Sequence, residues 1–195
     1  MSDENKHPPV EDLARRFDQV LDQDTALKAP PVEQWDPPHR GDLDMRISRD
    51  GQWHYQGKPL TRQSLVRLFA SIVRLEPNGD YVLVTPAEKF RIQVEDVPFV
   101  AHSLEVTGQG DDQVLWLTTS TDDRLALGPE HALVLEQGPD SQEPAPYVWV
   151  RRNLQARIER STWYHLINLA EEREHQGETH LGVLSQGQFF SLGCL

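Results

Sequence analysis

The sequence predicts an α+β protein that consists of two tandem related units. Short segments of alternating apolar and polar residues are typical of antiparallel strands, and only a few amphipathic segments have helical spacing. In addition, one order of elements occurs twice: strand, short link, helix and strand-like hairpin occupy residues 51–95 and return in residues 147–193. We therefore expect a domain duplication in which each unit packs one helix against a mainly antiparallel sheet.

The 195 residues are enough for one large domain or two small ones. We divide the chain into an acidic N-terminal extension (1–34), a first α+β unit (35–105) and a second α+β unit (106–195). Within the extension, Val10, Leu13 and Phe17 recur at helical spacing. This pattern predicts a short amphipathic helix that docks by its apolar stripe.

The first unit opens with a predicted hairpin over residues 43–55. A three-residue loop with Gly51 in the left-handed conformation would set Ile47 opposite Trp53 and gather the apolar residues on one face. A two-residue turn would set Ile47 opposite His54 instead. The three-residue loop is therefore the predicted connection.

The next segment predicts a helix that begins near Thr61, a good capping residue, and ends at Glu76-Pro77. Its expected buried stripe consists of Leu65, Leu68, Phe69, Ile72 and Leu75. Two strands follow at residues 81–85 and 90–95. Thr85 and Glu88 in the turn between them match a capping box.

In the second unit, residues 114–118 and 124–127 predict a hairpin, and residues 132–136 predict a further strand. A strand at residues 147–152 then leads into a helix over residues 159–174. The two segments at 180–185 and 187–193 predict a closing pair of strands.

The formal net charge of −12 argues against nucleic acids and anionic membranes as partners, because both require a basic surface. No apolar run approaches the roughly 18 residues that a membrane span needs, so we expect no membrane insertion. The N-terminus lacks the pattern of a signal peptide, and a single cysteine suits a reducing compartment. These features predict a cytoplasmic location.

The positive charge is concentrated in two segments that contain no carboxylate. Residues 51–75 carry four basic side chains and residues 144–158 carry three. Both segments surround the predicted link between a strand and a helix. The arginines either face water and pair with distant acids, or they form an anion site where the two helix starts meet.

No catalytic motif stands out, so we predict no catalytic residue and lean against an enzyme. Gly108-Gln109-Gly110 lacks the third glycine and the following helix of a dinucleotide fingerprint, which favours a turn. The densest group of potential metal ligands comprises His165, Glu171, Glu172, His175 and His180. We interpret that group as an exposed helix end, and we predict no metal site and no particular cofactor.

Three motifs carry a resemblance to a known family: residues 35–69 (WDPPHRGDLDMRISRDGQWHYQGKPLTRQSLVRLF), then LVTPAEK and VEDVPF. The chain resembles the bacterial domain of unknown function 1285 family from Trp35 to the C-terminus, and PYVWVRRNLQARIERSTWYHLI fits the same family more loosely. The resemblance implies two duplicated α+β units, of which the second is superficially like a pleckstrin-homology fold. It also implies a nucleotide-like ligand between the units and a role in signalling, with no established activity.

Together, these features predict a module for signal transduction that binds a nucleotide-like or phosphate-bearing anion. The expected ligand-binding residues are Arg62, Arg67, Thr85, Glu88, Lys89, Asp96, Arg151 and Arg157. Arginine side chains suit bidentate phosphate binding, and a helix N-terminus favours negative charge. The alternative is a non-catalytic adaptor that binds a protein partner.

Overall fold

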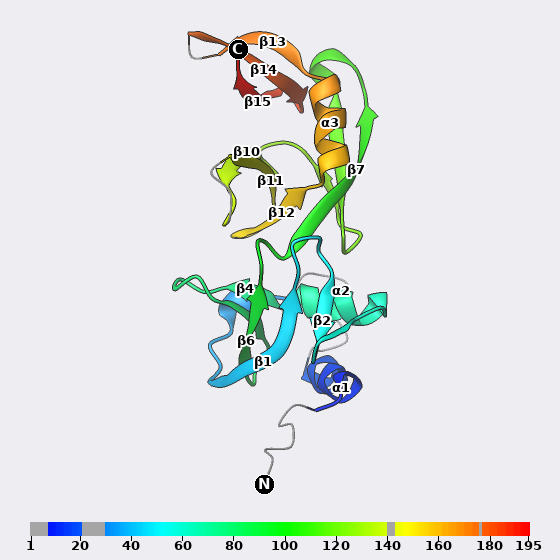
Figure 1. Cartoon of the computed structure of the whole chain (residues 1–195), viewed down its shortest axis with the longest axis vertical. Helices are drawn as coiled ribbons and strands as arrows, with labels where there is room; N and C mark the ends of the chain where they lie inside the picture. The colour runs from blue at the N-terminus through cyan, green and yellow to red at the C-terminus, as the bar shows by residue number, and fades with distance from the viewer. Residues whose placement is uncertain (1–7, 21–29, 140–142, 176) are drawn as a thin grey trace. The chain divides into compact units, whose positions relative to one another are not determined.

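The computed structural model describes residues 8–20, 30–139, 143–175 and 177–195. It divides the chain into two compact units, Met1–Pro98 and Phe99–Leu195 (Figure 1). Each unit contains a six-stranded sheet and a packed helix, which confirms the predicted α+β class with two tandem units. The sequence-based boundary at residue 105 falls inside strand β7 (Phe99–Thr107).

The first unit contains helices α1 (Val10–Val20) and α2 (Gln63–Ser71) and the short 3-10 helix η2 (Val32–Gln34). Its sheet has the order β3-β2-β1-β6-β5-β4. The strands are β1 (His39–Ile47), β2 (Trp53–Tyr55), β3 (Lys58–Pro59), β4 (Val73–Leu75), β5 (Tyr81–Val84) and β6 (Lys89–Val94). Among the described residues, no helix is both long and apolar enough to cross a bilayer.

The hairpin between β1 and β2 has the predicted register. Ile47 lies opposite Trp53, and Gly51 has a φ of 81°, in the left-handed region. Both Ile47 and Trp53 are buried. The need to bury all apolar residues on one face therefore selects the three-residue loop.

Helix α2 begins close to the predicted start but ends earlier than predicted. Arg62, not Thr61, is the N-cap residue, and it makes no side-chain capping hydrogen bond. At the other end, residues 73–75 leave the helix and form β4, which pairs with β5. The backbone N–H of Val84 donates to the carbonyl of Ile72 at 3.0 Å. Sheet hydrogen bonds therefore replace helical ones at Ile72 and Val73, whose β-branched side chains favour strands. Leu65, Leu68 and Leu75 are consequently only half-buried, while Phe69 and Ile72 are buried.

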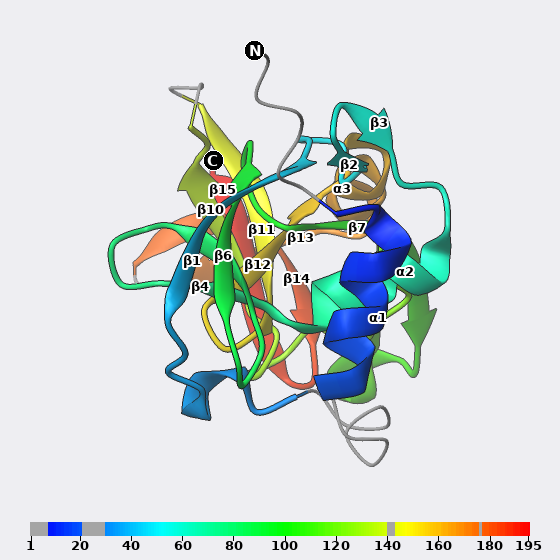
Figure 2. The same cartoon turned by 90° about the horizontal axis from the view of Figure 1, so that it is seen from below.

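Helix α1 docks by its apolar stripe, as predicted. Leu13 and Phe17 are each 1% exposed. The Phe17 ring meets the ring of Phe69 on α2 edge-on at 6.0 Å and that of Phe90 on β6 at 6.4 Å. Figure 2 shows α1 running beside α2. The N-terminal helix is therefore part of the core of the first unit.

The second unit has a six-stranded sheet with the order β10-β11-β12-β7-β8-β9 and a three-stranded sheet with the order β13-β14-β15. Its further elements are η3 (Gly110–Asp112), β8 (Val114–Thr119), β9 (Arg124–Ala126), β10 (Leu133–Gln137), β11 (Pro144–Arg151), β12 (Leu154–Ile158), α3 (Arg160–Asn168), β13 (Glu171–His175), β14 (Glu178–Ser185) and β15 (Gln188–Cys194). The buried Ser185 side chain joins the two sheets. Its hydroxyl donates to the Leu127 carbonyl at 2.7 Å and accepts from the Leu115 N–H at 2.9 Å.

The helix predicted over residues 159–174 was too long. Helix α3 ends at Asn168, and Glu171–His175 forms β13, which pairs with β14 along its whole length. Glu171 and His175 therefore do not share a helix face. The conformation of this segment is set by its pairing with a neighbouring strand, which the periodicity of the sequence does not reveal.

The repeated order is nevertheless present in both units. Helix α2 is followed by the antiparallel meander β4-β5-β6, and α3 is followed by the antiparallel meander β13-β14-β15. Each six-stranded sheet also contains one parallel pairing, β1 with β6 and β7 with β12. The sequence predicted mainly antiparallel sheets and did not foresee these two pairings, which need long connections.

Candidate ligand-binding site

The expected ligand residues of the first unit start with the turn between β5 and β6. Thr85 is buried, and its hydroxyl accepts the backbone N–H groups of Ala87 at 3.3 Å and Glu88 at 3.2 Å. The same hydroxyl donates to the Glu88 carbonyl at 3.1 Å. Its hydrogen-bonding capacity is thus used to shape the turn.

The charged groups of this turn lie in ion pairs within the first unit. The Glu88 carboxylate accepts a hydrogen bond from Arg16 on α1, and the Lys89 Nζ lies 3.3 Å from a carboxylate oxygen of Glu76. Arg74 also binds Glu76, through its Nε at 2.7 Å. Burial raises the pKa of Glu76, but the hydrogen bonds and charges of Arg74, and then of Lys89, outweigh it and hold the pKa below its usual 4.5. These pairs hold the turn and α1 in place.

Three further expected residues lie elsewhere in the first unit. Arg62, 62% exposed, lies 3.9 Å from a carboxylate oxygen of Glu11 on α1, and Arg67 is exposed on α2. Asp96 lies just after β6. Burial, and to a smaller extent the charge of Asp96, raise the pKa of Tyr81 to about 12. Arg62 and Lys89 therefore have different carboxylate partners, Glu11 on α1 and Glu76 just after β4.

Arg151 is the most buried of the expected arginines. Its side chain is 19% exposed, its guanidinium lies 4.9 Å from the centre of the Phe99 ring, and its Nη1 is 3.9 Å from the Asp123 carboxylate. That carboxylate already accepts the Thr121 hydroxyl at 2.7 Å. Burial lowers the pKa of Arg151, the Asp123 charge opposes this effect, and the neighbouring charge of Arg152 adds to it.

Arg157 lies away from Arg151 along the β11–β12 hairpin. Arg151 pairs with Leu154 beside the turn, whereas Arg157 lies farther along β12, opposite Tyr147. The Arg157 side chain is half-buried, near Gly138. Within the second unit, the two expected arginines are therefore at different positions along one hairpin.

A pocket of about 370 Å³ opens on the first unit where β1 diverges from β6. Between the pairs Asp42–Arg91 and Arg46–Gln93, β1 advances four residues while β6 advances two, so a bulge interrupts the parallel ladder. The pocket is lined by Asp42, Leu43, Gly79, Asp80, Tyr81, Arg91, Ile92, Gln93 and Val94. Bulges of this kind are over-represented next to functional sites.

Charged groups from three segments converge on this pocket. The Arg91 guanidinium donates to both carboxylate oxygens of Asp42, at 2.8 Å and 2.5 Å, and its Nη1 lies 3.9 Å from a carboxylate oxygen of Asp80. The hydrogen bonds from Arg91 lower the pKa of Asp42, and the pKa of Arg91 is raised in return. Two carboxylates thus face one guanidinium, and the charged lining has a net charge of −1.

Asp42, Asp80 and Arg91 were not among the residues expected from the sequence. Asp42 and Arg91 come together because β1 and β6 are parallel neighbours, a pairing between segments about fifty residues apart, and Asp80 precedes β5, which pairs with β6. One local signal was available. Gly41, which has a φ of 110°, interrupts the alternation of the strand immediately before Asp42.

Comparisons with known proteins give a consistent result across the chain. Residues 30–97 match the model described as "Domain of unknown function (DUF1285), N-terminal domain", and residues 98–192 match "Protein of unknown function (DUF1285), C-terminal domain". No curated protein matches the sequence.

Two solved structures are similar to the chain. A crystal structure of a DUF1285 family protein from Silicibacter pomeroyi DSS-3 shares 46% identity with a TM-score of 0.77, and the alignment covers 86% of this chain and 88% of that one. A DUF1285 family protein from Shewanella baltica OS155 shares 28% identity with a TM-score of 0.50, over 65% of this chain and 91% of that one.

Proposed function

The chain belongs to the DUF1285 family, which is described as of unknown function, and we propose that it is a non-catalytic module that binds a small polar molecule in the pocket beside β1 and β6. The pocket itself carries the proposal. A concave site with a few convergent polar groups is the default location for a small ligand. The β1 bulge, the Asp42–Arg91 pair and Asp80 supply those groups.

The charge of the lining supports a particular ligand chemistry. Because two carboxylates already face the Arg91 guanidinium, a phosphate group would meet a net negative surface. Hydroxyl or ammonium groups, in contrast, can donate to the carboxylate oxygens of Asp42 and Asp80. We therefore expect a polyhydroxyl or amine ligand in this pocket rather than an anion.

A thermal-shift screen of the full chain against polyols, amino sugars, polyamines, nucleotides and phosphorylated metabolites tests the proposal. A ligand at a hundred times its Kd adds about 2.7 kcal/mol to the free energy of unfolding. The stabilisation by a polyol or amine should be lost in Asp42→Asn and Asp80→Asn. It should be retained in Asp44→Asn, an exposed β1 residue that does not line the pocket.

Two outcomes would overturn this proposal. In the first, no polyol or amine stabilises the chain at millimolar concentration. In the second, Asp42→Asn and Asp80→Asn bind the ligand as tightly as the unchanged chain. Either outcome would favour the alternative of a non-catalytic adaptor.

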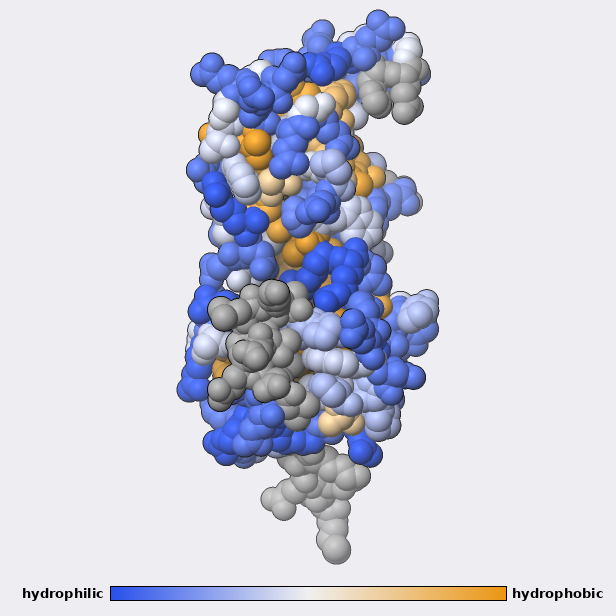
Figure 3. All heavy atoms as spheres, turned by 180° about the vertical axis from the view of Figure 1, so that it is seen from behind, coloured by the Kyte–Doolittle hydropathy of each residue, from blue (hydrophilic) through white to orange (hydrophobic). Residues whose placement is uncertain are grey.

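The adaptor alternative concerns apolar groups on the surface. In the part of the chain that is described, the exposed large apolar side chains are Val106, Leu135, Tyr164, Leu169 and Leu195. All of them belong to the second unit. Figure 3 shows apolar residues interspersed among hydrophilic ones on the face it presents. Such scattered residues are normal on monomeric proteins and do not specify a partner. A signalling role would require, in addition, that ligand binding alters the interaction with another protein.

A further inference from the structure

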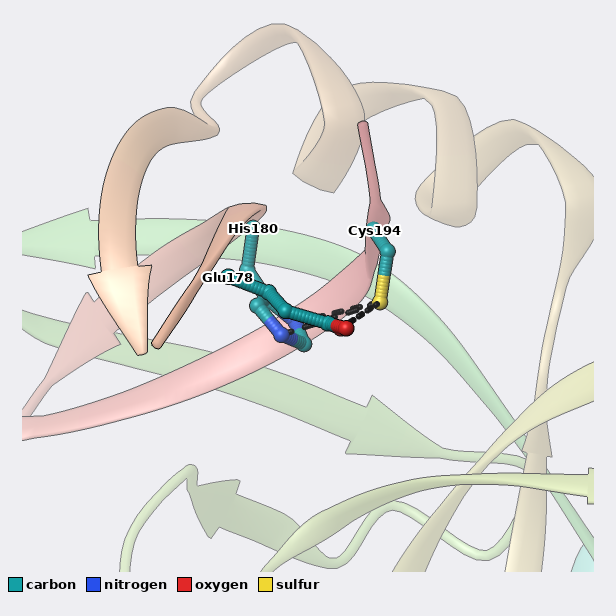
Figure 4. A group of neighbouring side chains, drawn as sticks. All are labelled: Glu178, His180 and Cys194. Carbon is teal, nitrogen blue, oxygen red and sulfur yellow. Dashed lines mark hydrogen bonds between the residues drawn. The ribbon is translucent and has the colours of Figure 1, made fainter. Parts of the chain in front are cut away.

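Three potential metal ligands of different chemistry converge at the end of the three-stranded sheet in the second unit. They are Glu178 and His180 on β14 and Cys194 on β15, and their donor atoms all lie within 4.8 Å of one another. Figure 4 shows the three side chains pointing toward one another. The sequence interpretation grouped His180 with helix-end residues and did not include Glu178 or Cys194.

The strand geometry explains why these residues meet. Glu178 and His180 are two residues apart on one strand, so their side chains lie on the same face. Cys194 is the cross-strand partner of His180 in the antiparallel pair β14–β15. The N–H of Leu195 donates to the Thr179 carbonyl at 3.0 Å and holds the end of the chain against β14.

We propose that Glu178, His180 and Cys194 form a binding site for Zn²⁺ or a similar thiophilic divalent cation, with water at the fourth position. Thiolate, imidazole and carboxylate are the ligand types that zinc uses in proteins, and a site with three protein ligands keeps one position open. Binding would replace the thiol proton of Cys194, which is released to solvent.

Two of the three donor separations are close to those of tetrahedral coordination. With typical Zn–S, Zn–N and Zn–O distances, donor atoms around a tetrahedral zinc ion lie about 3.5 Å apart. The Cys194 Sγ lies 3.6 Å from the His180 Nε2 and 3.7 Å from a carboxylate oxygen of Glu178. The donor atoms of His180 and Glu178 lie within 4.8 Å of each other.

Ser191 provides the outer support that such a site requires. Its Oγ lies 2.7 Å from the His180 Nδ1. If the Nδ1 carries the proton and donates to Ser191, the Nε2 lone pair is directed to the metal. A ligating histidine is usually held through its other ring nitrogen in this way, and loss of the outer partner typically costs 10–100-fold in metal affinity.

Co²⁺ is a suitable spectroscopic probe, because Cys194 is the single cysteine of the chain. A cobalt–thiolate charge-transfer band can therefore arise only from Cys194. We expect one equivalent of Co²⁺ to produce this band in the reduced full chain, and Zn²⁺ to displace the cobalt and remove the band. Cys194→Ser should abolish the band.

Variants of the other groups test the rest of the site. His180→Ala and Glu178→Gln should each weaken Zn²⁺ binding more than tenfold, and Ser191→Ala should weaken it about 10–100-fold. His165→Ala, which removes an exposed histidine from α3, should bind as the unchanged chain does. Because Glu178 and Cys194 are exposed, their substitution should leave the unfolding transition of the metal-free protein unchanged.

The proposal would be overturned if the reduced chain showed no cobalt–thiolate band at stoichiometric Co²⁺. It would also be overturned if folded His180→Ala and Glu178→Gln bound Zn²⁺ with unchanged affinity. Either result would mean that the three side chains interact only through hydrogen bonds of the thiol.

Discussion

At the level of single side chains, two arginines of the first unit differ in burial and therefore in their expected contribution to stability. Arg74 is 8% exposed and donates to the carbonyls of Val32 and Trp35, at 2.6 Å and 2.7 Å, as well as to Glu76. Arg15 is 67% exposed and pairs with Asp12 one turn away on α1. The two arginines should therefore contribute very differently to stability.

Arg74→Met should lower the free energy of unfolding by about 3–5 kcal/mol, because it leaves buried acceptors and a partly buried carboxylate without their donor. Arg15→Met should change it by less than about 0.5 kcal/mol. Urea denaturation of the full chain measures both values. A loss of less than about 1 kcal/mol in Arg74→Met would contradict the structural role of this arginine.

Glu76 predicts a pH dependence of stability. Its pKa in the folded protein is below the usual 4.5, so its contribution is present above that pH and is lost as the pH falls through the folded pKa. The urea midpoint should therefore decrease as the pH is lowered from 4.5 through the folded pKa of Glu76, and it should decrease less steeply in Glu76→Gln. Parallel curves for the two proteins would show that Glu76 is not responsible.

Gly51 is the residue on which the first hairpin depends. Its φ of 81° is unfavourable for residues with a Cβ atom, by about 1–2 kcal/mol. Gly51→Ala should lower the free energy of unfolding by that amount, and Gly51→Asn by less, because asparagine tolerates this region better. Equal losses in the two variants, measured by chemical denaturation, would argue against a backbone origin.

Among the secondary-structure elements, α1 has the most instructive role. The Tyr55 hydroxyl donates to the Pro8 carbonyl at 2.6 Å just before the helix, and Arg16 pairs with Glu88. Phe17 adds a fully buried ring between α2 and β6. Buried aromatic contacts of this kind outweigh exposed ion pairs in stabilising a docked helix.

Phe17→Ala should therefore lower the free energy of unfolding by about 3–5 kcal/mol and expose α1 to limited proteolysis. Asp18→Ala, on the exposed side of the same helix, should change it by less than about 0.5 kcal/mol. If α1 remained protected from protease in Phe17→Ala, polar contacts rather than the apolar stripe would be holding the helix.

For the whole molecule, the decisive feature is that each unit has its own core. In the second unit, Phe99, Leu115, Leu117 and Leu127 are fully buried, and Ser185 links its two sheets. The first unit has a separate set of buried residues around Trp53 and Phe69. A compact unit with its own core is able to fold alone.

A fragment of residues 99–195 should therefore fold without the first unit. We expect a dispersed amide NMR spectrum and a single cooperative urea transition. A fragment that begins at residue 106 lacks most of β7, which pairs with both β8 and β12, and should not fold. A cooperative transition in the shorter fragment would contradict the assignment of β7 to the second core.

Local patterns in the sequence were sufficient for the α+β class, the repeated order, the register of the first hairpin and the docking of α1. Each of these depends on apolar periodicity and turn residues within a short segment, as in the placement of Ile47 opposite Trp53. The family resemblance was also correct, because it rests on dense motifs in order.

The tertiary structure alone decided which segments are neighbours. The parallel pairing of β1 with β6 creates the pocket with Asp42, Asp80 and Arg91, and strand pairing turns residues 171–175 into β13 rather than a helix end. The approach of Cys194 to His180 likewise depends on the β14–β15 register. Periodicity reports which face of a segment is buried but not which strand lies beside it, and sites made by side chains of neighbouring strands depend on that second fact.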